Sequence, residues 1–159
     1  MNEKIISLSQ KGDTIVMKLT NGDNKVVYMK YTDYSLEKLQ LLFIDTDTFK
    51  KYWARNTYDE YSRYTTASEN ELRQDYKFEY AEKGFSHGEK DPVPLAIISL
   101  LDITTPPCID ITDGYTRTVW LMANNYKIIP FDFANVTSDF LNEKGVYTLN
   151  NIREWIYGY

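Results

Sequence analysis

The residues whose types and spacing best suit chemistry form the short run Asp113-Gly114-Tyr115-Thr116-Arg117. If a helix begins at this turn, its first N–H groups and the positive end of its dipole face the glycine. Gly114 would let a ligand approach the backbone, and Thr116 could donate a hydroxyl. Arg117 could bind an oxyanion through two hydrogen bonds. The run therefore predicts a phosphate-binding site at Gly114, Tyr115, Thr116 and Arg117.

Asp113 and Arg117 are also the candidate catalytic residues. Arg117 would neutralise phosphate charge, and Asp113 could hold Mg²⁺ or position a water molecule. A structural alternative stays open, in which Arg117 only pairs with Asp110 or Asp113. The sequence leaves open whether the site is catalytic and whether it uses a metal, and a nucleotide with Mg²⁺ is the candidate cofactor.

The elements that must position this turn can be recognised on both sides of it. Residues 108–112 have the composition of a strand, and residues 119–123 carry apolar side chains at helical spacing. Asn124 and Asn125 can close that helix in the left-handed conformation. Residues 128–133 return as a strand. A strand, turn, helix and strand over residues 92–133 therefore form the predicted core of the domain.

The rest of the chain predicts a single α+β domain over residues 1–159, with a mixed β-sheet and flanking helices. Runs at 5–8, 14–20 and 25–31, with Asn21-Gly22 as a hairpin signal, predict a β-meander within a β-rich part at 1–45. Residues 39–44 and 95–101 are expected as buried strands, and a helix carrying Phe49, Tyr52 and Trp53 follows the first of them. A helix from the Ser68 cap to about Lys83, a loop at 85–91 and a last helix at 149–156 complete the prediction.

Composition restricts the classes of function. The chain has 159 residues, 43% of them hydrophobic, and a net charge of −5, which argues against a broad basic face for nucleic acid. One cysteine, Cys108, and one histidine, His87, exclude an intramolecular disulfide and a two-histidine metal site. No apolar run reaches membrane-spanning length, and the first apolar stretch is too short for a secretory signal. We expect a cytoplasmic protein that does not bind membranes.

Tyrosines gather in the middle third of the chain, which holds several of its 14 tyrosines. Their rings bury area at little entropic cost and their hydroxyls suit recognition surfaces, although packing in the core is the alternative interpretation. The residues predicted to bind a partner are Tyr58, Tyr61, Tyr64, Tyr76 and Tyr80.

The run from Ile111 to Leu121 and its continuation from Asn125 to Phe131 resemble a known pattern. The pattern is the strand, Asp-Gly-x-His-Arg, helix and Ile-Pro-Val of the ParB/sulfiredoxin-like fold, and the likeness is greatest to the plasmid fertility inhibition factors. A helix around Trp53 also fits that group. The resemblance implies a nucleotide or nucleic-acid phosphate site at Gly114 and Arg117. Thr116 stands where histidine is usual, and Cys108 lies upstream of the turn, so the sulfiredoxin reaction is not expected.

Two functions follow as hypotheses. The first is a small protein of a plasmid or phage that binds phosphate at the Gly-x-x-Arg turn and inhibits transfer or acts in conflict between mobile elements. The second is an acidic, tyrosine-rich inhibitor or immunity-type protein that blocks a basic nuclease or nucleic-acid-binding enzyme. The oligomeric state is left open.

Overall fold

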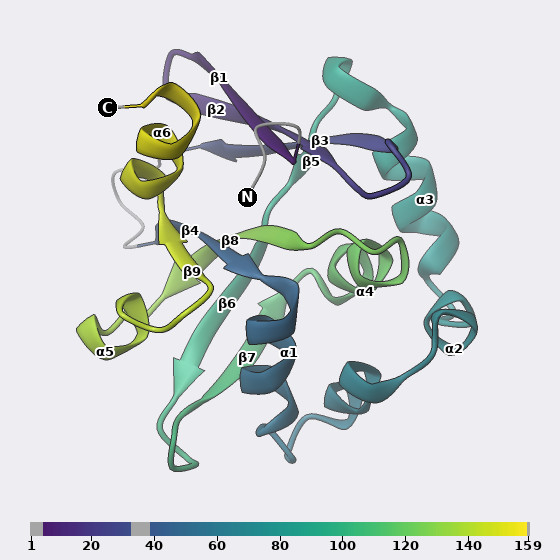
Figure 1. Ribbon diagram of the computed structural model, residues 1–159. Helices are drawn as coiled ribbons and strands as arrows, with labels where there is room; N and C mark the ends of the chain where they lie inside the picture. The colour runs from purple at the N-terminus through teal and green to yellow at the C-terminus, as the bar shows by residue number, and fades with distance from the viewer. Residues whose placement is uncertain (1–4, 33–38, 159) are drawn as a thin grey trace.

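The computed structural model describes residues 5–32 and 39–158, and its strands form two sheets (Figure 1). The four-stranded sheet has the order β1 (Ile6–Lys11), β2 (Thr14–Thr20), β3 (Val26–Thr32), β5 (Val93–Pro94). The five-stranded sheet has the order β7 (Cys108–Asp113), β6 (Ala96–Leu101), β8 (Ile128–Ala134), β4 (Gln40–Asp45), β9 (Val146–Thr148).

The first sheet confirms the predicted meander. β1, β2 and β3 pair in antiparallel register, and the short β5 joins β3 in parallel. Alternation decides which face is buried, because Ile15, Met17 and Leu19 on β2 lie in the core while Lys18 is exposed. The sequence therefore defines both the strand and its inward face.

Helices flank the second sheet and join it to the first (Figure 1). The α-helices are α1 (Thr46–Ala54), α2 (Glu69–Arg73), α3 (Phe78–Ser86), α4 (Tyr115–Ala123), α5 (Ser138–Leu141) and α6 (Leu149–Tyr157). Two 3-10 helices are η1 (Glu60–Thr66) and η2 (Gly88–Lys90). The fold is thus the predicted α+β arrangement of mixed sheets with flanking helices.

Aromatic side chains hold these layers together. On α1, Phe49 stacks on Phe131 of β8 with ring centroids 4.9 Å apart. On α4, Trp120 stacks on Phe85 of α3 at 4.3 Å. Each of these rings is buried, so α1 and α4 are fixed against the elements that surround the predicted turn.

One predicted helix is two helices in the structure. Ser68 forms the expected capping box with Glu71, but α2 ends after five residues, and α3 begins only at Phe78. The break lies at Asp75, whose carboxylate accepts hydrogen bonds from the Lys77 amide at 3.1 Å and from the Tyr64 hydroxyl at 2.8 Å. A side chain that bonds its own backbone in this way competes with the helix.

Other boundaries were also wrong. Gly84 does not end α3, because the next residue, Phe85, packs on Trp120 and carries the helix to Ser86. The predicted loop at 85–91 therefore begins in α3 and contains η2. Short elements that the sequence did not indicate are β5, η1, α5 and β9. In the described part of the chain, no helix combines the length and apolar character needed to cross a membrane.

Candidate functional site

The predicted turn joins β7 to α4, as expected. Gly114 is the N-cap of α4 and adopts φ 106°, a left-handed conformation that favours glycine. A Cβ atom at this position would lie 2.5 Å from the Cβ and 2.8 Å from the Cα of Ala96 on β6. Gly114 is therefore required by the positive φ and by the close approach of the turn to β6.

Arg117 lies in the first turn of α4 with its side chain 23% exposed. Its Nη2 donates to the carbonyl oxygen of Leu95 at 3.1 Å and lies 3.3 Å from Oδ2 of Asp113. Its Nε is buried and has no hydrogen-bond partner among the described residues. Of the two ion pairs that the sequence offered for Arg117, the described residues form the one with Asp113 and not the one with Asp110.

The other residues of the turn point in different directions. The Tyr115 hydroxyl donates to Oδ2 of Asp59 at 2.6 Å, and burial followed by this hydrogen bond raises the pKa of Tyr115. Only the backbone of Tyr115 can therefore serve an anion at the turn. Thr116 is half-buried, and no hydrogen bond of its hydroxyl occurs in the part of the chain that the structure describes.

Asp59, which the sequence did not single out, organises the neighbourhood of Tyr115. Its Oδ2 also accepts from Trp53 Nε1 at 2.9 Å, and its Oδ1 accepts from the Tyr61 amide at 2.9 Å. Tyr61 packs on Tyr115 with ring centroids 5.0 Å apart. The Asp59 carboxylate thus links α1, η1 and α4 through hydrogen bonds to Trp53, Tyr61 and Tyr115.

The predicted partner-binding tyrosines divide into two groups. Tyr58, Tyr76 and Tyr80 are 82%, 75% and 74% exposed. Tyr61 and Tyr64 are partly buried and stack on each other at 5.9 Å. Burial, then the hydrogen bond to Asp75, raises the pKa of Tyr64 to about 12. Three of the five are therefore free to contact a partner, and two mainly support η1.

Near Tyr58 and Tyr61, a cavity of about 510 Å³ opens beside β7. We call it the acidic cavity. The residues that line it are Asn56, Tyr58, Asp59, Glu60, Tyr61, Leu101, Ile103, Asp110 and Tyr115. The spacing of Asn56, Asp59 and Asp110 in the sequence gives no signal that these three residues meet.

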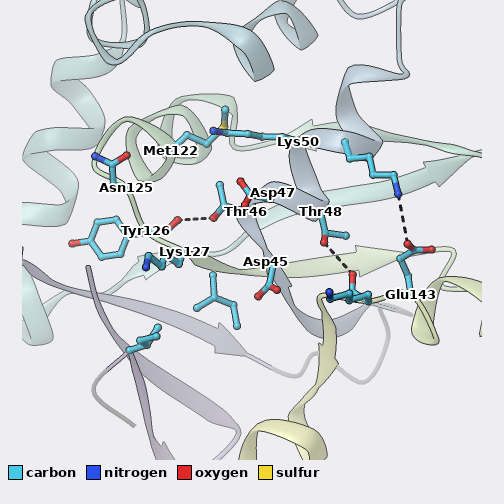
Figure 2. Close-up of a pocket in the computed structure, with 14 residues that line it drawn as sticks. Asp45, Thr46, Asp47, Thr48, Lys50, Met122, Asn125, Tyr126, Lys127 and Glu143 are labelled. Carbon is cyan, nitrogen blue, oxygen red and sulfur yellow. Dashed lines mark hydrogen bonds and ion pairs between the residues drawn. The ribbon is translucent and has the colours of Figure 1, made fainter. Parts of the chain in front are cut away.

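Another cavity, of about 870 Å³, lies at the N-terminus of α1 (Figure 2). Its wall carries both signs of charge, with Lys50, Lys51, Lys127 and Lys144 beside Asp45, Asp47 and Glu143. Lys51 Nζ lies 3.9 Å from Glu143 Oε1. Asp45 is the N-cap of α1, but its side chain makes no capping hydrogen bond within the described residues. The mixed charge favours neither anions nor cations.

The described residues contain no preformed cluster of metal ligands. Within residues 5–32 and 39–158, no group of three or more His, Cys, Asp or Glu side chains could hold a metal ion. Cys108 is buried in β7, and His87 at the end of α3 lies 3.6 Å from Asp91. Any Mg²⁺ at Asp113 would therefore depend on ligands that a nucleotide brings.

Comparison with known proteins supplies the family. The model of the Plasmid Fertility inhibition factor family matches residues 41–144, well over half of the chain. No curated protein matches the chain. Among solved structures, the fold is similar to that of the oncogenic suppression activity protein, described as a plasmid fertility inhibition factor and solved as a gold(I) cyanide derivative. That match has a TM-score of 0.73 and 18% identity, and it covers 94% of this chain and 81% of the other.

The similarity in structure shows a shared fold, and the family match covers the turn, α1, α4 and the acidic cavity. The wider ParB/sulfiredoxin-like assignment stays a prediction. Because the family model spans residues 41–144, this chain belongs to the plasmid fertility inhibition factor family.

Proposed function

We propose that this chain performs its plasmid-related inhibition role by binding a nucleotide or nucleic-acid phosphate at the Gly114–Arg117 turn. The observation that carries the proposal is the buried Nε of Arg117, which has no partner within the described residues. It lies in the first turn of α4, where no described side chain caps the amides at the N-terminus. A phosphate oxygen would satisfy both kinds of donor.

Asp113 would compete with a phosphate for Arg117. Its carboxylate, 66% exposed, pairs with Nη2 of Arg117 and competes with an incoming anion. An exposed ion pair of this kind contributes little to stability, so phosphate can displace it. Once released, Asp113 could position water or share a Mg²⁺ ion with the nucleotide. Thr116 supplies a hydroxyl and no titratable group, so the proposal concerns binding and not turnover.

Calorimetry on wild type and Arg117→Ala tests the proposal, with a nucleotide panel in Mg²⁺ and with short single- and double-stranded DNA as ligands. Binding to wild type and an at least tenfold loss in the variant would support it. Arg153→Ala is the matched control, since Arg153 lies on α6, outside the turn, and its Nη2 donates to Oε1 of Gln10 at 3.2 Å. Thermal unfolding of each variant separates a lost site from a lost fold. Absence of any binding to wild type would overturn the proposal.

A second candidate function is inhibition through a basic protein partner. It is favoured by the exposed rings of Tyr58, Tyr76 and Tyr80 on a chain of net charge −5. Aromatic contacts surrounded by carboxylates suit the surface of a nuclease or other nucleic-acid-binding enzyme. The double variant Tyr76→Ala and Tyr80→Ala should weaken binding to such a basic partner, measured by calorimetry, without changing thermal stability. Unchanged affinity would contradict this use of the surface.

A further inference from the structure

The acidic cavity has an unbalanced charge. Its wall includes Asp59, Glu60 and Asp110, and none of the described residues that line it is Lys, Arg or His. None of these three carboxylates forms an ion pair with any described residue. The cavity therefore attracts cations and repels the anions that the Gly114–Arg117 turn would bind.

The two aspartates differ in how far the chain satisfies them. Asp59 accepts three hydrogen bonds from Trp53, Tyr61 and Tyr115. Within the described residues, Asp110 accepts only one, at 3.5 Å, from the amide nitrogen of Asn56. Burial, followed by the charge of Asp59, raises the pKa of Asp110. Of the two aspartates, Asp110 is therefore the one with acceptor capacity to spare.

Asn56 supplies a second, independent sign of a ligand. It is only 2% exposed, and its amide nitrogen donates to the Ile109 carbonyl at 3.2 Å. Its Oδ1 is buried and has no hydrogen-bond partner in the described part of the chain. A buried acceptor without a donor is uncommon in folded proteins and calls for an explanation. A donor that enters the cavity beside Asp110 would satisfy it.

The aromatic residues that line the cavity indicate which chemical group could donate to Asn56 Oδ1. Tyr61 and Tyr115 form one aromatic side, and the exposed Tyr58 stands at the rim. A guanidinium group is planar, stacks on aromatic faces and carries five N–H donors, so it can reach a carboxylate and a carbonyl together. A bare metal ion is disfavoured, because the carboxylates of this cavity do not form a metal-binding cluster.

We propose that the acidic cavity binds an arginine side chain of a protein partner. The guanidinium donates to the Asp110 carboxylate and to Asn56 Oδ1, and it stacks against the tyrosine rings. A single cation in a cavity with an exposed rim gains affinity mainly when the partner covers that rim, where Tyr58 and Ile103 are exposed. The inference rests on the second candidate function and deepens it, and it does not depend on phosphate binding at Arg117.

Calorimetry with an arginine-containing peptide, its lysine counterpart and free agmatine tests this inference. The arginine peptide should bind wild type at least tenfold more tightly than Asp110→Asn. The matched control Asp13→Asn removes one charge from the turn between β1 and β2 and should change the affinity less than twofold. The lysine peptide should bind several-fold more weakly than the arginine peptide. Agmatine binding as tightly as the peptide would overturn the protein partner in favour of a small guanidinium compound.

A second variant keeps the test decisive if Asp110→Asn is poorly folded. Tyr58→Ala removes an exposed ring and should leave thermal unfolding unchanged while it weakens the arginine peptide about threefold or more. Equal affinities of wild type, Asp110→Asn and Tyr58→Ala would overturn the inference. A basic protein that binds Asp110→Asn and Tyr58→Ala as tightly as wild type, but loses affinity for the Tyr76 and Tyr80 variant, would show that the partner uses that surface without this cavity and would overturn the inference as well.

Discussion

The Gly114–Arg117 turn and the acidic cavity meet at Tyr115, yet they leave different groups unsatisfied. At the turn, Arg117 is mostly held by its own chain, through Leu95 and Asp113. In the cavity, Asn56 Oδ1 has no donor and Asp110 has only a long one, within the described residues. Among the described residues, each site thus holds one buried side-chain atom without a hydrogen-bond partner, Arg117 Nε at the turn and Asn56 Oδ1 in the cavity, and a sequence motif marks only the turn.

The largest effect should come from Gly114→Ala, which breaks the turn. The added Cβ would meet Ala96 at a φ that L residues rarely adopt, so we expect a loss of about 4 kcal/mol in the free energy of unfolding. Urea denaturation measures it. Gly12→Ala is the control, because φ is also positive there but nothing lies within 4 Å, and it should lose only about 1 kcal/mol. Equal losses in the two variants would mean that β6 does not constrain the turn.

A smaller effect should come from Asp59→Ala, which removes the support shared by the turn and the cavity. Trp53 Nε1, the Tyr115 hydroxyl and the Tyr61 amide each lose an acceptor, so we expect a loss of about 3 kcal/mol in urea denaturation. Asp13→Ala should change stability by less than about 0.5 kcal/mol, as other exposed sites do. A near-neutral Asp59→Ala would show that the three donors find water instead.

Asp110→Asn should act in the opposite direction and by less. Because the folded pKa of Asp110 is raised above 3.8, ionising this carboxylate is harder in the folded than in the unfolded chain. Its charge therefore lowers stability at neutral pH, and this loss disappears as pH falls through the folded pKa towards 3.8. We expect a higher melting temperature for Asp110→Asn at pH 7 and a shrinking difference from wild type below that pKa. A difference that does not vary with pH would contradict the burial of this charge.

Much of the fold could be predicted from periodicity and turn chemistry. Alternation on β2, the apolar run of β6 and the strand–glycine–helix order around Gly114 are local signals, and the structure confirms them. The break between α2 and α3 could not be predicted, because it depends on the Tyr64 hydroxyl reaching Asp75 from another element. Local patterns cannot report such a contact.

Because local patterns report only contacts between residues close in the sequence, the turn could be predicted and the acidic cavity could not. Gly114 and Arg117 are close in sequence, so their spacing predicts that they meet. Asn56 and Asp110 are 54 residues apart, and only the packing of the end of α1 against β7 brings their side chains together. The acidic cavity is thus a product of tertiary structure, and no motif in the sequence marks it.

The smallest effect on stability, and the sharpest test of the turn, should come from Asp113→Asn. The exposed pair with Arg117 contributes little, so we expect a change of less than about 0.5 kcal/mol in the free energy of unfolding. Removing the competing carboxylate should nevertheless strengthen phosphate binding severalfold, most clearly at low salt, where charges are least screened. Calorimetry with inorganic phosphate and with a nucleotide at two salt concentrations measures this. If Asp113→Asn weakens nucleotide binding in Mg²⁺ but strengthens phosphate binding without it, Asp113 holds the metal as well as competing for Arg117. If neither ligand responds, the guanidinium is committed to Leu95 and the turn serves the fold alone.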